Sequence, residues 1–221
     1  HADVYASALR IAKERGAEFV LHTGDVSADG SPENLKLMAD VGRSAGLDVY
    51  TAVGNHDIRG DDTGRLFTEH FNQPNMAFDR GGYRIIILDN AERKIGFAEA
   101  TLRFLSDDLA AHPQARYIMM FHRPFGLPLS AILGDDETNA SRATNERFLT
   151  AIGNTNIEAI FTGHLHIYLP FSLAGIRSFV TGGGGGEAQA ALGPLGDQSK
   201  HFLMVQTDQS GTLRVDVEKL P

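Results

Sequence analysis

Four apolar segments of this chain each end in a short polar motif, and this repeat limits the possible folds more than any other feature. Each segment reads as a buried strand and is followed at once by glycine or histidine. The pairs are EFVLHT before Gly24-Asp25, DVYTAV before Gly54-Asn55-His56-Asp57, RYIMMF before His122-Arg123, and IEAIFT before Gly163-His164-Leu165-His166. Such strands belong in a sheet that presents polar residues at the carboxyl ends of its strands.

Helical patterns alternate with these strands, which predicts an α/β architecture. Apolar spacing predicts helices over 2–15, 31–46, 97–111 and 142–153, and a further strand over 83–90. Ser31 reads as the N-cap of the second helix. After residue 166, short strand-like segments separated by glycine-rich turns predict a sheet meander. We expect one domain over residues 1–221.

Composition narrows the chemistry. The 221 residues include no cysteine, so a metal would be held by histidine, carboxylate, amide or backbone oxygen. A formal net charge of −8 argues against general nucleic-acid binding. No apolar run reaches the roughly 18 residues that a membrane span needs. Cytosolic and exported bacterial proteins both fit this composition, so the compartment stays open, as does the oligomeric state.

The residues of the four motifs suit a divalent cation. Carboxylate, amide oxygen and imidazole are the ligands that hard and borderline cations prefer. Four neighbouring strands would bring them to one rim. His164 and His166 are one residue apart, so in an extended segment they face the same side. Each motif alone is a common turn, and it is their joint occurrence that predicts a metal cluster.

In this order, GD (24–25), GNHD (54–57), His122 and GHLH (163–166) resemble the motifs of the calcineurin-like metallophosphoesterases. The resemblance implies a four-layer sandwich of two mixed β-sheets flanked by helices. It also implies two divalent metal ions, which could be Mn, Fe, Zn, Co or Ni, with a metal-bound hydroxide. The implied activity is hydrolysis of a small phosphate ester, either a phosphomonoester or a phosphodiester.

Carried over motif by motif, the resemblance assigns the metal ligands. Asp25 would bridge both ions, Asn55, His122 and His164 would complete the ligands of the second ion, and His166 would bind the first. The alternative reading of each histidine alone is a hydrogen-bonded surface residue.

The resemblance also implies roles for residues that are not ligands. His56 would protonate or stabilise the leaving group, and Asp57 would orient its imidazole. Arg59 and Arg123 lie beside motif residues and are candidates for bidentate contact with phosphate, with surface salt bridges as the alternative.

One motif of the family, Asp-x-His on a first strand, does not occur before Gly24. We expect that strand and its aspartate to lie upstream of His1, which falls where the motif's histidine would be. Without that strand the first ion would keep Asp25, His166 and His1. A catalytically weak or inactive metal-binding module is therefore the alternative function.

Three further features of the sequence are not assigned to the metal site. His22 is expected to be a packed histidine, and Asp89 and Asn90 to form a cap or turn. The glycine run 182–186 is either a flexible turn or a loop where backbone must approach a ligand closely.

Overall fold

A mixed six-stranded sheet lies at the centre of the computed structural model, which describes residues 2–60, 64–127, 138–188, 190–208 and 210–221. The strand order is β3-β4-β5-β6-β8-β7. Strands β4, β5, β6 and β8 run parallel, whereas β3 and β7 are antiparallel to their neighbours. Their bounds are β3 Met76–Arg80, β4 Tyr83–Ile87, β5 Tyr117–Met120, β6 Ile157–Thr162, β7 Tyr168–Leu173 and β8 Ile176–Thr181.

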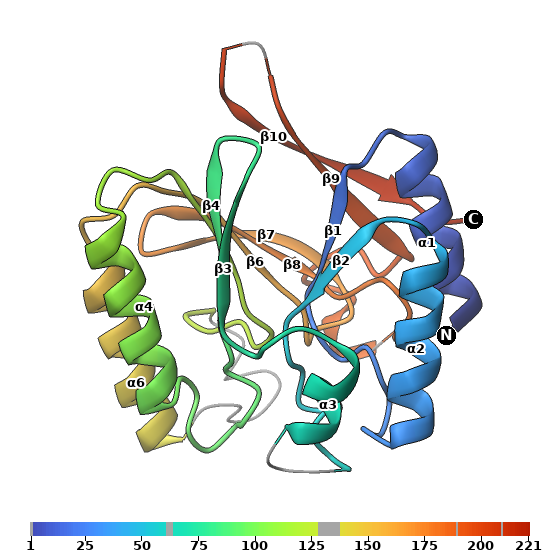
Figure 1. Ribbon diagram of the computed structural model, residues 1–221, viewed down its shortest axis with the longest axis horizontal. Helices are drawn as coiled ribbons and strands as arrows, with labels where there is room; N and C mark the ends of the chain where they lie inside the picture. Colours follow the sequence, from blue (N-terminus) through green and yellow to red (C-terminus); the bar gives the residue numbers. More distant parts are fainter. Residues whose placement is uncertain (1, 61–63, 128–137, 189, 209) are drawn as a thin grey trace.

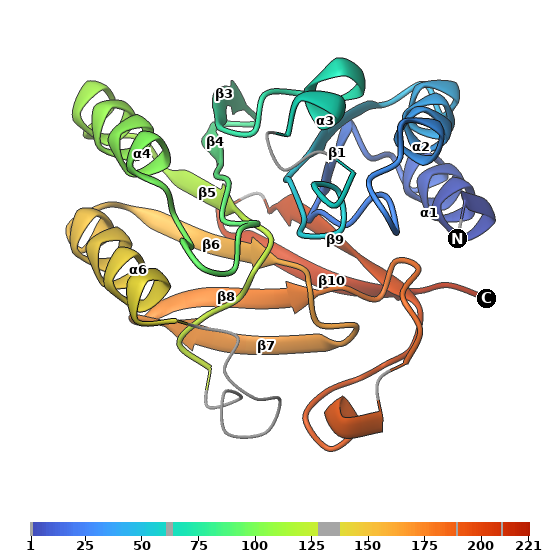
Figure 2. The ribbon, with the colours of Figure 1, turned by 90° about the horizontal axis from the view of Figure 1, so that it is seen from below.

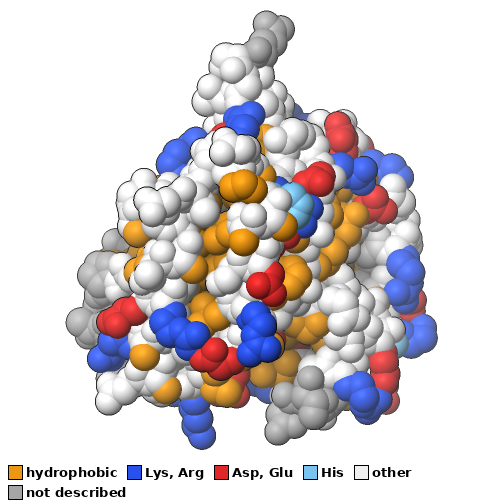
Figure 3. All heavy atoms as spheres, turned by 60° about the vertical axis from the view of Figure 1, so that its left-hand side comes forward, with side chains coloured by type: hydrophobic (Ala, Val, Ile, Leu, Met, Phe, Trp, Pro, Cys, Tyr) orange, Lys and Arg blue, Asp and Glu red, His pale blue; other side chains and the backbone are white. Residues whose placement is uncertain are grey.

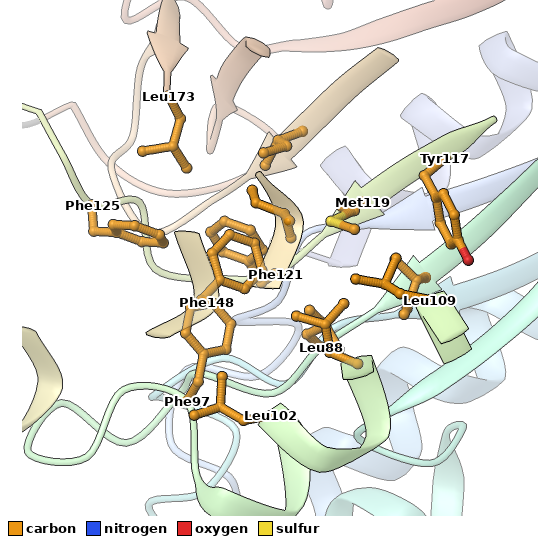
Figure 4. Packing of buried hydrophobic residues seen from close by; sticks show 14 residues of the cluster. Leu88, Phe97, Leu102, Leu109, Tyr117, Met119, Phe121, Phe125, Phe148 and Leu173 are labelled. Carbon is orange, nitrogen blue, oxygen red and sulfur yellow. The ribbon is translucent and has the colours of Figure 1, made fainter. Parts of the chain in front are cut away.

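Two helices, α4 (Glu99–Ala111) and α6 (Asn139–Ile152), cover one face of this sheet (Figure 1). Phe97 and Phe148 are fully buried and stack with ring centroids 4.6 Å apart, and Phe121 of the β5 end meets Phe148 edge to face. Figure 4 shows these rings at the middle of the largest apolar cluster. Burying such aromatic area anchors both helices to the sheet.

Two small strand pairs cover the other face (Figure 2). One is the parallel pair β1 (Phe19–His22) and β2 (Asp48–Thr51); the other is the antiparallel pair β9 (His201–Thr207) and β10 (Leu213–Lys219). Residues of both pairs pack against the six-stranded sheet in one apolar cluster. Helices α1 (Ala2–Glu14) and α2 (Pro32–Ser44) pack outside β1 and β2.

The four expected layers are therefore present, with one difference. The second sheet layer consists of two separate pairs and not of one mixed sheet, because no hydrogen-bonded ladder joins them among the described residues. The expected meander is also wrong: β7 and β8 complete the large sheet, whereas β9 and β10 form their hairpin in the other layer.

Most elements lie where the sequence places them, and Ser31 caps α2 as expected. The sequence pattern missed β3 and the short helix α3 (Arg65–His70). The N-cap position of α3 is Gly64, in a left-handed conformation with no side-chain cap, so the usual start signal is absent. A short 3₁₀ turn, η1 (Ala190–Leu192), precedes β9.

The four motifs come from both layers and not from four neighbours in one sheet. Strands β1 and β2 carry GD and GNHD, while β5 and β6 carry the His122 loop and GHLH. The carboxyl ends of these strands point to the lower end of Figure 1, which faces the viewer in Figure 2. The rim is thus a junction between two layers.

On the face of the molecule in Figure 3, acidic and basic side chains are interspersed, and no broad basic patch is visible there. None of the described helices is long and apolar enough to cross a membrane.

Candidate metal centre

Side chains from both layers converge at this junction. Asp25, His122 and His164 each offer a ligand atom, and these atoms lie within 4.8 Å of one another. His122 Nε2 is 3.2 Å from Asp25 Oδ2 and 3.1 Å from Asn55 Oδ1. The rings of His122 and His164 meet edge to face at 5.1 Å. The four residues assigned to one shared cation therefore meet in space.

The ring of His122 tests whether a cation fits. Its Nδ1 is 2.8 Å from the carbonyl oxygen of Thr23, so Nδ1 carries the proton of a neutral imidazole. The bare Nε2 then faces two more acceptors, the oxygens of Asp25 and Asn55. His122 is fully buried, so this concentration of lone pairs is costly unless positive charge lies nearby, and Arg123 Nη1, 3.2 Å from Asn55 Oδ1, supplies part of it. A divalent cation held by these atoms meets that need.

Electrostatics agree with this arrangement. Burial by itself would raise the pKa of Asp25, but the nearby imidazole of His122 and the amide of His56 hold it below its ordinary value. Asp25 is therefore ionised at neutral pH, as a ligand must be.

Two candidate ligands have unusual backbone conformations. Asp25 has φ 54° and His164 has φ 65°; among the described non-glycine residues only Ala174 shares this property. A left-handed conformation is costly for such residues and is concentrated at functional sites.

The GD and GNHD loops touch through their backbones. A Cβ atom on Gly54 would overlap Asp25 N and Oδ1, so only glycine fits there. The amide of His56 donates to Asp25 Oδ1 at 2.8 Å. Gly24, with φ 93°, lies so close to His122 that a Cβ would come within 2.6 Å of Nδ1. The motif glycines are thus required by close approach and not only by sharp turns.

The sequence analysis expected Asp57 to orient the imidazole of His56. In the structure Asp57 contacts two backbone amides instead. Its two carboxylate oxygens accept from the amides of Ser27 at 2.8 Å and Gly54 at 2.9 Å. The residue is 1% exposed, and burial raises its pKa to about 7 despite both amides. Asp57 therefore ties the GD loop to the GNHD loop.

His56 is held instead by Ala28 and Arg59. Its Nδ1 lies 2.8 Å from the carbonyl oxygen of Ala28, and its Nε2 lies 3.1 Å from Arg59 Nη2. Nδ1 therefore donates and Nε2 accepts. Arg59, expected beside phosphate, contacts His56 in this structure.

Arg123, the other arginine expected beside phosphate, is 8% exposed and donates through Nη1 to Asn55 Oδ1 at 3.2 Å. Its backbone is held by Asn90, a residue that the sequence assigned to a cap or turn. Asn90 follows β4, and no local motif marks it, because its partners lie more than 30 residues away.

His166 is not part of the cluster of Asp25, His122 and His164. Residues 164–167 are bent, with amide-to-carbonyl bonds from Leu165 to Gly163 and from Ile167 to Leu165, so the extended segment expected for the two histidines is not formed. His1 lies outside the described residues.

The glycine run holds the ring of His166. Nδ1 of His166 lies 2.8 Å from the carbonyl oxygen of Glu187, and a Cβ on Gly186 would overlap the ring. A Cβ on Gly183 would likewise overlap His201. The run is therefore closely packed at Gly183 and Gly186, where it approaches histidine rings, and open at Gly184; approach to a ligand stays a prediction. With Nδ1 donating to Glu187, the lone pair of the His166 ring lies on Nε2.

His22 shows the opposite tautomer. Its Nδ1 accepts from the amide of Gly24 at 3.2 Å, and its ring meets Tyr5 edge to face. Desolvation lowers the pKa of His22 to about 4. It is a packed histidine, as expected.

Comparison with known proteins gives a consistent result. The sequence profile of the family described as calcineurin-like phosphoesterase matches residues 2–168. A 3',5'-cyclic-nucleotide phosphodiesterase of Nostoc sp. is 25% identical over 154 residues, which are 67% of this chain and 56% of that protein. The chain thus spans about half the length of this curated relative.

Two solved structures share the fold. A dimetal phosphatase from Danio rerio superposes with a TM-score of 0.61 at 16% identity, over 81% of this chain and 76% of its own. The purple acid phosphatase PPD1 from yellow lupin superposes with a TM-score of 0.70 at 17% identity, over 99% of this chain and 47% of its own. At these identities the likeness concerns the fold alone.

Proposed function

The chain belongs to the calcineurin-like phosphoesterase family, and from this premise we propose that it hydrolyses phosphate esters at a centre of divalent cations. The proposal includes a dinuclear centre, with Asp25 shared between the ions. The substrate would be a small phosphomonoester or phosphodiester. A diester is supported by the name of the Nostoc relative, a cyclic-nucleotide phosphodiesterase.

One observation carries the proposal: three acceptor atoms, His122 Nε2, Asp25 Oδ2 and Asn55 Oδ1, converge, and the cationic Arg123 also donates to Asn55 Oδ1. These three atoms and a ring nitrogen of His164 would hold one cation. His166, through Nε2, and Asp25 would contribute to a second. The bound cations would supply Lewis acidity and a nucleophile at neutral pH.

The chain's own residues would handle the proton of the leaving group. His56 keeps Nδ1–H on Ala28, so Nε2 is the atom that would deliver a proton to the leaving oxygen. Nε2 now faces a donor, Arg59 Nη2, and two donors cannot share that position. Proton delivery by His56 would therefore require Arg59 to move away from the ring.

The test combines metal analysis with turnover in the full-length protein. We expect bound divalent metal by elemental analysis, and Mn²⁺-dependent hydrolysis of p-nitrophenyl phosphate or its bis-ester. Asp25→Asn should lose both metal and turnover. Asp29→Asn makes the same chemical change in the same loop, at an exposed aspartate whose partners are Ser27, Ser31 and Asn34, and should keep both. An Asp25→Asn protein with normal metal content would contradict the ligand assignment.

A second candidate function is a metal-binding module without turnover. It is favoured by the fact that the described residues form one carboxylate–histidine cluster and that His166 lies outside it. A full-length protein that binds one cation per chain and hydrolyses neither ester would support this candidate.

A further inference from the structure

The side chain of Asn90 forms hydrogen bonds with the backbone of the loop that carries His122. Its Oδ1 accepts from the amides of His122 at 3.1 Å and Arg123 at 2.9 Å, and its Nδ2 donates to the carbonyl oxygen of Arg123 at 2.8 Å. Asn90 is 3% exposed, so water does not compete for these bonds. All three end on backbone atoms of two consecutive residues, which fixes where both side chains begin.

Both of these side chains reach Asn55. Arg123 Nη1 donates to Asn55 Oδ1 at 3.2 Å, and the same oxygen lies 3.1 Å from His122 Nε2. The donation from Arg123 also requires the oxygen, and not the nitrogen, of the Asn55 amide to point toward the cluster. The backbone held by Asn90 is thus the common origin of two contacts on one candidate ligand atom.

We propose that Asn90 is a positioning residue that sets the distance between His122 Nε2 and Asn55 Oδ1. The inference rests on the proposed function, because it takes these two atoms to bind one cation. Asn90 itself contacts neither atom. It acts through the His122 peptide on one side and through Arg123 on the other, as residues that orient metal ligands commonly do.

Asn72 provides a matched control. Its Oδ1 accepts from the amide of Thr51 at 2.7 Å and its Nδ2 donates to the carbonyl oxygen of Thr51 at 2.9 Å. This is the same amide-to-peptide clamp, placed at the end of β2 on a residue outside the cluster. Loss of either clamp removes hydrogen bonds of the same kind, but only Asn90 holds a candidate ligand.

The experiment compares Asn90→Ala with Asn72→Ala in the full-length protein. Mn²⁺ affinity is measured by electron paramagnetic resonance of the free ion, and coordination by the visible absorption spectrum of the Co²⁺ form. We expect Asn90→Ala to weaken Mn²⁺ binding about 10- to 100-fold and to change the Co²⁺ bands. Asn72→Ala should lower the melting temperature yet leave affinity and spectrum unchanged. Equal Mn²⁺ affinity in the two variants would overturn the inference.

Asn90→Asp covers the case in which Asn90→Ala does not fold. Aspartate keeps an acceptor for both amides, but it loses the donation to the carbonyl oxygen of Arg123 and places a carboxyl oxygen against that carbonyl oxygen. We expect it to fold and to keep Mn²⁺ affinity within about threefold of the unmodified protein, whereas a loss of about tenfold or more would contradict the role given to the acceptor bonds.

The unmodified protein separates the two proposals. If it binds neither Mn²⁺ nor Co²⁺, the proposed function fails and this inference fails with it. If it binds them and the Asn90 variants bind equally well, only the inference fails.

Discussion

The two layers that meet at the candidate centre hold their residues by different means. On the β1–β2 side, Asp25 is enclosed by backbone, with Gly54 in direct contact and the buried carboxyl group of Asp57 tying two loops together. On the β5–β6 side, His122 is held by a neutral amide, Asn90, above the largest apolar cluster. The first side should tolerate no added atom, whereas the second should tolerate conservative change. Close approach and hydrogen bonding are thus alternative ways to fix a ligand.

The largest effect is expected from Gly54→Ala. The added Cβ overlaps Asp25 N and Oδ1, so either the carboxylate or the GNHD loop must shift. A displacement of about 1 Å at a reacting centre can cost roughly 100-fold in rate, and we expect at least that loss of turnover. Metal content by elemental analysis should fall together with turnover.

Gly184→Ala is the control for this prediction, because a Cβ there meets nothing within 4 Å. It should leave turnover and metal content unchanged. A Gly54→Ala protein that matched Gly184→Ala would show that the β1–β2 side is not held by close approach.

The next largest effect is expected when the side chains that hold the two loops, Asp57 and Asn90, are each changed to the other's residue type. Asp57→Asn places an amide nitrogen where an oxygen now accepts from Ser27 or Gly54, so one buried N–H loses its partner. We expect a loss of about 3 kcal/mol in the free energy of unfolding, measured by urea titration of the metal-free protein. Asn90→Asp keeps both acceptor bonds, so no buried N–H loses its partner, and protonation of the new carboxyl can restore the donation to Arg123; it should cost less. The reverse order of the two losses would remove the distinction between the layers.

A smaller effect concerns acid stability on the β1–β2 side. The pKa of His22 is lowered to about 4 in the folded protein, against 6.5 for an ordinary histidine. The folded state therefore favours the neutral ring, and this contribution is complete above pH 6.5 and is lost as the pH falls toward 4. It amounts to about 3 kcal/mol at most, from roughly 1.4 kcal/mol per pKa unit.

His22→Asn tests this, because its Oδ1 can still accept from the amide of Gly24. The stability difference between the unmodified protein and His22→Asn, both metal-free, should shrink between pH 6.5 and 4. Burial raises the pKa of Asp57 to about 7, which acts in the opposite direction, but it is common to both proteins and cancels in the difference. A difference that stays constant over this range would contradict the assigned tautomer.

The sequence predicted the residues of the centre better than their supports. Asp25, Asn55, His122 and His164 each lie within a few residues of the end of a strand, so local spacing locates them. The partners of Asp57 and Asn90 depend on tertiary contacts: Ser27 lies 30 residues from Asp57, and Arg123 lies 33 from Asn90. No periodicity records such contacts. The division of the motifs between two layers was missed for the same reason, because the order of strands in a sheet depends on tertiary contacts and not on the sequence of each strand.

The glycine run 182–186, in the loop before β9, holds a third candidate ligand, His166, and so extends the comparison. Gly186→Ala should push the ring of His166 away from the carbonyl oxygen of Glu187, because the Cβ overlaps the ring. We expect about tenfold weaker binding of one Mn²⁺ ion while the other is unaffected, measured by titration to saturation. If both ions weakened equally, or if one ion bound in every variant, the role proposed for His166 would be wrong.

The smallest effect separates two roles for Arg59, the exposed counterpart of buried Arg123. If Arg59 only occupies His56 Nε2, Arg59→Met frees that nitrogen for its proton, and kcat should rise by up to about fivefold with KM unchanged. If it binds substrate phosphate, KM should rise instead. Arg65→Met is the control, because Arg65 pairs with Glu69 within α3. Turnover over a range of p-nitrophenyl phosphate concentrations distinguishes these outcomes, and a rise in KM would place Arg59 at the substrate, as the sequence predicted.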